Sequence, residues 1–97
     1  MDSRFLNVKI KGDSMWPTFN DGDIISCEEY SGHVISIGDL VVFRHPFKHE
    51  VTCVKRVKYI TEKGYFVQGD NPDPLASEDS HNFGHVPEDT IFAFKKE

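Results

Sequence analysis

The longest predicted strand of the chain is Val51-Thr52-Cys53-Val54-Lys55-Arg56-Val57-Lys58-Tyr59-Ile60. Turn residues at Glu62-Lys63-Gly64 follow it and lead into Tyr65-Phe66-Val67-Gln68, a second run rich in aromatic and β-branched side chains. Two such runs joined by a short turn predict a β-hairpin. We therefore expect residues 51–68 to form one hairpin of a β-rich fold.

Lys55 lies in the middle of the more apolar face of this strand. Side chains alternate between the two faces of a strand, so one face carries Val51, Cys53, Lys55, Val57 and Tyr59. Among buried neighbours the ammonium group would lose hydration, its pKa would fall, and the neutral amine could act as a base. The alternative is a stem lying on the core with the ammonium in water, which is the commoner arrangement for a strand lysine.

Four other short runs extend the β prediction. Residues 5–11 alternate apolar and polar side chains, and residues 24–27, 40–44 and 90–94 are short apolar runs bounded by turn residues. No segment has the apolar spacing of a three-turn amphipathic helix. The prediction is a mainly β protein of short, mostly antiparallel strands and hairpins, with residues 1–97 forming a single domain.

Net charge, apolar runs and cysteine spacing indicate which partners and which cellular location to expect. The 97 residues carry a formal charge of −5 without a block of basic residues, so we expect no nucleic-acid partner. The first residues lack the apolar core of a secretory signal, and no run approaches the about 18 apolar residues of a membrane span. Cys27 and Cys53 have no metal-binding or redox spacing. We expect reduced thiols, no membrane contact and a cytoplasmic location.

A constrained bend is predicted at Gly12-Asp13-Ser14-Met15-Trp16-Pro17-Thr18. Gly12 and Asp13 are turn residues, and Pro17 fixes its own φ and favours an extended Trp16. Trp16 could serve as a substrate wall, dip into a membrane or be an ordinary half-buried aromatic. On this segment alone, a serine that bonds only to local backbone is the common case.

A second polar loop follows the hairpin. Gly69-Asp70-Asn71-Pro72-Asp73-Pro74 is dense in turn formers, and the next residues, 76–81, bring hydroxyl groups that could reach a site. The five histidines form no helical i, i+4 pair and have no cysteine close in sequence, so we expect surface histidines, no metal and no cofactor.

Four ordered motifs resemble those of the serine peptidase clan of type I signal peptidases and SOS-repressor-type self-cleaving proteins. They are Ser14-Met15-Trp16-Pro17-Thr18, Val54-Lys55-Arg56, Gly69-Asp70-Asn71 and Ser77-Glu78-Asp79-Ser80. Phe83-Gly84-His85-Val86-Pro87 is similar to the tail that follows the last motif. The resemblance covers about residues 8–93 and implies a small signal-peptidase/SOS-repressor-like catalytic core.

The resemblance also implies a role for each matched residue. Ser14 would be the nucleophile, Lys55 the general base and Ser77 the group that orients Lys55. Backbone N–H groups at Gly12 and Ser14 would stabilise the oxyanion. The implied structural residues are Met15, Pro17, Gly69, Asp70, Asn71, Asp79 and Ser80.

Departures from the family pattern concern the last loop and the surroundings of the core. His81 stands where arginine is usual, so the expected ion pair with Asp79 becomes dependent on pH. The segment between Asn71 and Ser77 is about two residues longer than usual, and the family's membrane anchors and large inserted β-domain have no counterpart in this sequence.

The implied activity is that of a Ser14/Lys55 endopeptidase that cuts a protein or peptide bound as an extended strand, with a small side chain in a shallow pocket before the cut bond. Among family members the chain resembles the small maturation proteases of nickel-type superoxide dismutase. Two other interpretations stay open: a catalytically idle, self-associating regulatory domain like the C-terminal half of a phage-type repressor, and a peripheral signal peptidase. The sequence does not define the oligomeric state.

Overall fold

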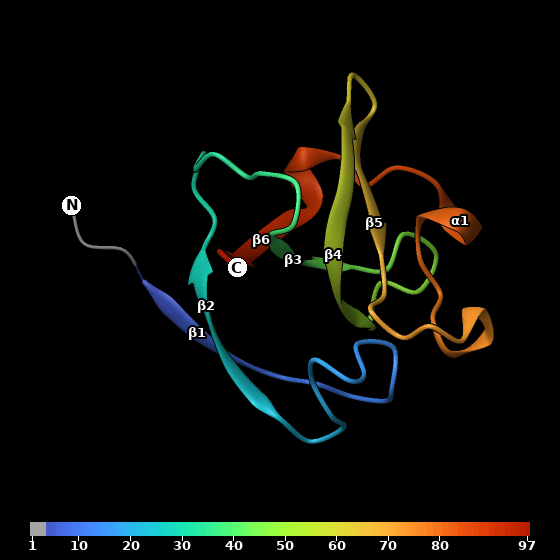
Figure 1. Cartoon of the computed structure of the whole chain (residues 1–97). Helices are drawn as coiled ribbons and strands as arrows, with labels where there is room; N and C mark the ends of the chain where they lie inside the picture. Colours follow the sequence, from blue (N-terminus) through green and yellow to red (C-terminus); the bar gives the residue numbers. More distant parts are fainter. Residues whose placement is uncertain (1–3) are drawn as a thin grey trace.

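A computed structural model describes residues 4–97 and places six strands in one antiparallel sheet. The sheet order is β1-β2-β6-β3-β4-β5 (Figure 1). The strands are β1 (Phe5–Lys9), β2 (Ile24–Glu29), β3 (Leu40–Arg44), β4 (Thr52–Thr61), β5 (Gly64–Gln68) and β6 (Ile91–Lys95). The predicted mainly β fold of short antiparallel strands is confirmed.

Within residues 4–97, helical structure is confined to three short pieces in the connection from β5 to β6. These are the 3₁₀ turns Pro74–Ala76 and Glu88–Thr90 and the single-turn helix α1 (Ser80–Phe83). Asp79 begins α1 because its side chain accepts the His81 N–H, while Asn82 bonds back to the Asp79 N–H, a reciprocal cap. This cap fixes the loop that follows the Gly69-Asp70-Asn71 motif.

Two hydrophobic clusters cover the two faces of β3. Leu40 and Val42 pack in one cluster, whereas Val41 and Phe43 pack in the other, as the alternation of a strand requires. All four are fully buried, which explains why β3 is a continuous apolar run in the sequence. Met15 belongs to the Leu40 cluster and anchors the Ser14 bend to the core.

The predicted hairpin is confirmed, with one local difference. β4 and β5 pair antiparallel around a two-residue turn, but the register shifts between Val57 and Tyr59. The bulge turns Tyr59 outward, so that it is 61% exposed, and Val51 lies before β4 and is 40% exposed. Tyr59 therefore does not share the buried face with Lys55, whereas Val51, although partly exposed, lines the same cavity as Lys55 and Cys53.

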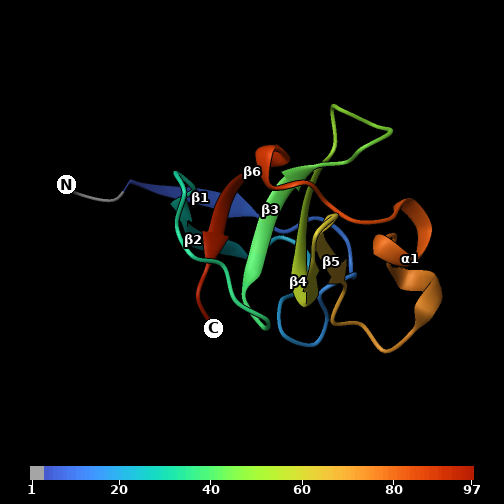
Figure 2. The same cartoon turned by 90° about the horizontal axis from the view of Figure 1, so that it is seen from above.

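The segment before β2 lies beside the start of β4, although about 40 residues separate them in sequence. Figure 1 shows the blue bend at the lower end of β4, and Figure 2 shows the loop between β3 and β4 projecting from the body of the molecule.

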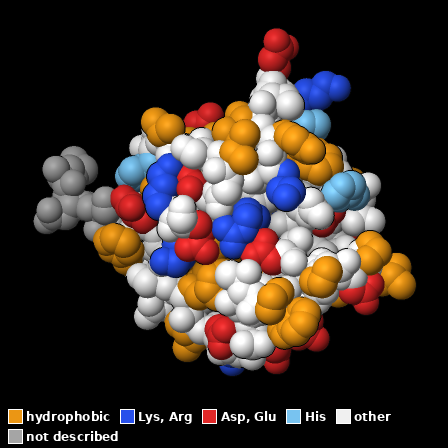
Figure 3. Space-filling model, in the orientation of Figure 1, with side chains coloured by type: hydrophobic (Ala, Val, Ile, Leu, Met, Phe, Trp, Pro, Cys, Tyr) orange, Lys and Arg blue, Asp and Glu red, His pale blue; other side chains and the backbone are white. Residues whose placement is uncertain are grey.

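Acidic and basic side chains are interspersed on the face of the molecule shown in Figure 3. Cys27 and Cys53 are free and buried.

Candidate active site

Ser14 and Lys55 are in direct contact. The Lys55 Nζ donates a hydrogen bond to the Ser14 Oγ at 2.8 Å. β4 supplies Lys55, which pairs with Val41 of β3 in the middle of the sheet, and the bend between β1 and β2 supplies Ser14. The lysine is only 6% exposed, so the arrangement in which its ammonium reaches water is not the one that this fold adopts.

The environment of Lys55 favours its neutral form. Burial lowers the pKa of Lys55 from its ordinary value, and the nearby groups of Cys53, Asp79 and Glu78 oppose only part of that shift. A lysine with a lowered pKa is a better base at neutral pH than a free lysine. The cause lies in the fold, because Lys55 sits between the buried Cys53 and Val57 on β4.

Local hydrogen bonds shape the bend around Ser14. Gly12 has a φ of +81°, a conformation that glycine adopts readily, and its N–H donates to Asp21 Oδ1 at 2.7 Å. The Gly12 N–H is therefore occupied in this structure, so its predicted contribution to an oxyanion hole would require that bond to break and stays a prediction. In residues 4–97 the Ser14 N–H has no acceptor, so it is free to donate to a substrate oxygen. The Trp16-Pro17 peptide bond is cis.

The Gly69-Asp70-Asn71 motif ties the bend to β4. The Asn71 N–H donates to the Ser14 carbonyl oxygen at 3.0 Å, and the Asn71 side chain donates to the Asp13 carbonyl oxygen at 2.8 Å. Asp70 accepts from the Thr18 hydroxyl at 2.6 Å and takes two hydrogen bonds from Arg56, at 2.9 and 2.8 Å. Because Arg56 follows Lys55, this network sets the position of Ser14 relative to Lys55.

Asp70→Asn is expected to lower the free energy of unfolding at pH 7 by about 1–3 kcal/mol, because it weakens the paired contact with Arg56. Burial alone would raise the pKa of Asp70, but hydrogen bonds from Arg56 and Thr18 hold that pKa below its ordinary value. A lowered folded-state pKa stabilises the protein above the unfolded-state value, near pH 4, and this contribution disappears as the pH falls further. Urea unfolding at pH 7 and pH 3 should show the difference shrinking; an equal difference at both pH values would contradict this.

Ser77 does not orient Lys55 directly in this structure. In the described part of the chain its hydroxyl donates to Asp79 Oδ2, at 3.3 Å. Asp79 also accepts the Gly69 N–H at 3.2 Å and contacts the His81 ring at 2.8 Å. Burial would raise the pKa of Asp79, but hydrogen bonds from His81 and Gly69 keep it below the ordinary value. The histidine that replaces the family arginine thus still pairs with Asp79.

Ser80 has a structural contact of its own. Its buried hydroxyl oxygen accepts the Val67 N–H of β5 at 2.8 Å. This contact fixes the start of α1 against the sheet.

Ser77→Ala is expected to lower kcat/KM by less than about tenfold, because it removes one hydrogen bond and leaves the contact between Ser14 and Lys55 in place. Rates on a cleavable peptide provide the measurement, together with the Lys55 pKa by NMR in both proteins. An effect as large as that of removing Lys55 would show that Ser77 acts on the base directly.

Sequence reasoning missed the pair formed by His45 and Glu78. His45 is 4% exposed, so the expectation that all five histidines lie at the surface is wrong for this one. Its Nε2 lies 2.5 Å from Glu78 Oε1. The one local signal is that His45 directly follows the buried β3, but nothing in the sequence relates it to a residue 33 positions away.

These residues share a cavity of about 160 Å³. It opens beside Ser14 and Lys55, and His45 and Glu78 form part of its wall. Buried apolar side chains, among them Met15, complete it. Within residues 4–97 no three or more His, Cys, Asp or Glu side chains gather in a group that could hold a metal ion.

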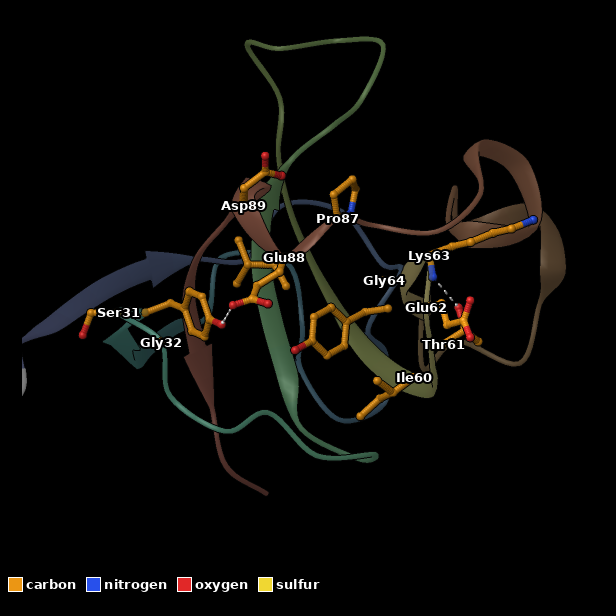
Figure 4. A pocket seen from close by; sticks show the side chains of 13 residues that line it. Ser31, Gly32, Ile60, Thr61, Glu62, Lys63, Gly64, Pro87, Glu88 and Asp89 are labelled. Carbon is orange, nitrogen blue, oxygen red and sulfur yellow. Dashed lines mark hydrogen bonds between the residues drawn. The ribbon is translucent and has the colours of Figure 1, made fainter.

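A wider cavity of about 700 Å³ lies elsewhere, between the β4–β5 turn and the 3₁₀ turn Glu88–Thr90 (Figure 4). Tyr30 donates to Glu88 Oε1 there, at 2.5 Å. None of the predicted site residues lines this cavity, and in Figure 4 the Lys63 side chain points away from it. The smaller cavity, which contains Ser14 and Lys55, is therefore the candidate active site.

Comparisons with known proteins agree with the motifs. The family model for Peptidase S24-like proteins matches residues 2–85. Over 102 residues the chain is 32% identical to mitochondrial inner membrane protease subunit 1 of Xenopus tropicalis, an alignment that covers 82% of this chain and 60% of that protein. No helix in residues 4–97 has both the length and the apolarity to cross a membrane. The chain belongs to the Peptidase S24-like family, within the serine peptidases related to signal peptidases and SOS repressors.

Proposed function

We propose that the protein is a serine endopeptidase in which Ser14 is the nucleophile and Lys55 the general base. The observation that carries the proposal is the 2.8 Å contact between the Lys55 Nζ and the Ser14 Oγ, made by a lysine buried in the sheet. A nucleophile and a base within hydrogen-bond reach are the geometric requirement for covalent catalysis. Family membership supports this reading of the pair.

The proposed reaction has two halves. Neutral Lys55 takes the Ser14 hydroxyl proton while the Ser14 Oγ attacks the peptide carbonyl carbon, and the Ser14 N–H donates to the developing oxyanion. Collapse of the tetrahedral intermediate breaks the C–N bond, and the leaving amine takes the proton from Lys55. Water, deprotonated by Lys55, then attacks the acyl-enzyme ester. The C–O bond to Ser14 breaks, the second product leaves with a new carboxyl group, and Lys55 returns the proton to the Ser14 Oγ.

The proposed substrate is an extended, flexible segment of a protein. The 160 Å³ cavity beside Ser14 has room for a small side chain, which supports cleavage after or near a small residue. We propose a cytoplasmic location and, as a specific candidate, the N-terminal propeptide of a nickel-type superoxide dismutase. Removal of that segment would free a new N-terminus able to ligate metal.

One comparison favours a second candidate. The relative from Xenopus tropicalis is named as a subunit of an inner membrane protease, which suggests action on exported precursors as a peripheral signal peptidase or within an assembly. The chain spans about 60% of that relative's length, so its assembly and substrates do not transfer directly. The third reading, an idle self-associating regulatory domain, gives no reason for a buried lysine in contact with Ser14.

Intact-mass measurement of a candidate precursor mixed with the purified protein tests the proposal. Loss of the leader with the wild-type protein, but not with Ser14→Ala, supports both the enzyme class and the substrate. Ser26→Ala is the matched control, because Ser26 is an exposed serine on β2. An unchanged precursor, with cleavage of other peptides, removes only the nickel superoxide dismutase substrate; no cleavage of any peptide removes the enzyme class.

Activity is expected to rise with pH through the lowered pKa of Lys55. The neutral amine is the active form, so the acid limb of kcat/KM follows deprotonation of Lys55 in the free enzyme. Because burial lowers that pKa, the limb should lie below the range of a free lysine, whose pKa is about 10.4. A pH series from 5 to 10, checked by NMR titration of Lys55, measures both values. A Lys55 pKa near that of free lysine, or an acid limb that does not match it, would contradict the assignment.

A further inference from the structure

The cavity beside Ser14 and Lys55 has one charged acceptor in its wall. Ile10, Met15, Cys53 and Val54 give it a buried apolar lining. Glu78 contributes a carboxylate to this lining. A charged acceptor beside the nucleophile is a feature that neither half of the proposed reaction uses.

His45 holds Glu78 in a defined position. The His45 Nδ1 accepts the Phe47 N–H at 3.0 Å, so the neutral ring carries its proton on Nε2 and donates it to Glu78 Oε1. The ring also packs edge-on against Phe83, with 5.1 Å between ring centroids. A buried ring with both nitrogens bonded has little freedom to rotate, so it acts as a fixed support for the carboxylate.

The second carboxylate oxygen of Glu78 remains free. Both contacts of Glu78 within residues 4–97, from His45 Nε2 and from Lys48 Nζ at 3.4 Å, go to Oε1. The side chain is 51% exposed, and neither contact occupies Oε2, so that oxygen keeps its capacity to accept a hydrogen bond. The hydrogen bond from His45 keeps the pKa of Glu78 below its ordinary value, so the group is ionised at neutral pH.

We propose that Glu78, supported by His45, is a specificity-determining residue that selects a substrate side chain with a hydrogen-bond donor, namely serine, threonine or asparagine. Oε2 would accept the hydrogen bond of a side chain that enters the cavity, and the cavity volume limits that side chain to a small one. An alanine has no donor and would gain no hydrogen bond from this acceptor. The inference rests on the proposed peptidase function and adds a substrate class to it.

Lys9 and Lys11 define the competing outcome. Both line the same cavity and could attract an acidic substrate side chain instead. Both lysines are exposed, and within residues 4–97 neither side chain has a hydrogen bond that fixes it, whereas His45 holds the Glu78 carboxylate in place. Glu78 would also repel a carboxylate. Preference for a neutral donor and preference for an acid are therefore separable results.

The test has two stages. Digestion of a proteome-derived peptide library by the wild-type protein, read by mass spectrometry, identifies the position whose side chain is selected. Paired peptides that carry serine or alanine at that position are then compared with wild-type protein and with Glu78→Ala, Glu78→Gln and Glu62→Ala. Glu62 lies on the exposed β4–β5 turn and is the matched control.

The wild-type protein is expected to prefer the serine peptide by about tenfold in kcat/KM, the usual scale for one charge-assisted hydrogen bond. The ratio should fall to about one in Glu78→Ala, to an intermediate value in Glu78→Gln, and stay near ten in Glu62→Ala. A purely structural role of Glu78 would slow both peptides equally and leave the ratio unchanged, which would overturn the inference.

Three other results would overturn the inference about Glu78. Enrichment of aspartate or glutamate at the selected position, or equal rates on the paired peptides with the wild-type protein, would overturn the inference while leaving the peptidase intact. The absence of any cleavage by the wild-type protein would remove the proposed function and this inference together. Thermal melts of each variant confirm that the comparison is made on folded protein.

Discussion

Replacement of Lys55 by alanine is expected to lower kcat/KM by about 10³-fold or more while the protein stays folded. In the proposed reaction the change removes the group that takes the Ser14 proton, and general-base catalysis contributes about 10²–10⁴-fold to such reactions. The fold should tolerate the loss, since a buried amine whose charged form is disfavoured adds little to stability. Initial rates on a cleavable peptide and a thermal melt of the same sample separate the two effects.

Lys55→Arg sharpens this test. A guanidinium stays protonated at every accessible pH, so the variant keeps a long cationic side chain but cannot serve as a base. It should be as inactive as Lys55→Ala and show no acid limb. Lys63→Ala, on the exposed β4–β5 turn, is the matched control and should keep full activity. Appreciable activity in Lys55→Arg would argue for another base.

Local patterns predicted the strands well because each carries its own signal. The alternation of residues 5–11 and the apolar run of residues 40–44 depend only on neighbours in sequence, and both correspond to strands in the structure. β1 ends at Lys9, two residues earlier than predicted. The Ile10 N–H still bonds to the Asp23 carbonyl in register, but the Ile10 carbonyl accepts the Gly22 N–H, one residue out of register, so the ladder breaks there. The register shift after Val57 had no signal, since bulges depend on the partner strand.

The proposed Ser14/Lys55 pair was predictable only through resemblance. The Lys55 strand and the Ser14 bend are each ambiguous alone, and 41 residues separate the two side chains. Two hydrogen bonds that none of the matched motifs includes were not predicted. The Gly12 N–H is taken by Asp21, nine residues on, across the bend, and the buried His45 pairs with Glu78, 33 residues away. No periodicity encodes such contacts, so the structure had to supply them.

Gly69→Ala is expected to have the second large effect, a loss of about 10²-fold in kcat/KM. An added Cβ would lie 2.6 Å from the Ser14 carbonyl oxygen and 2.4 Å from the Ser77 Oγ. The serine side chain could rotate away, but the Ser14 oxygen belongs to the backbone that carries the nucleophile. Moving that backbone by even 1 Å from the base can cost about 10²-fold in rate. The strain should also lower the free energy of unfolding by about 1–3 kcal/mol.

Two further variants identify the cause of the loss. The double variant Gly69→Ala with Ser77→Ala removes the clash with Ser77 but keeps the clash with the Ser14 backbone, so its activity should stay low. Gly32→Ala introduces a side chain at φ +84° with open space around it, far from Ser14 in the fold. It should lower stability by about 1 kcal/mol without changing kcat/KM. Recovery of activity in the double variant would instead place the critical contact at Ser77, and full activity in Gly69→Ala alone would show that the bend can move without loss of the reactive geometry.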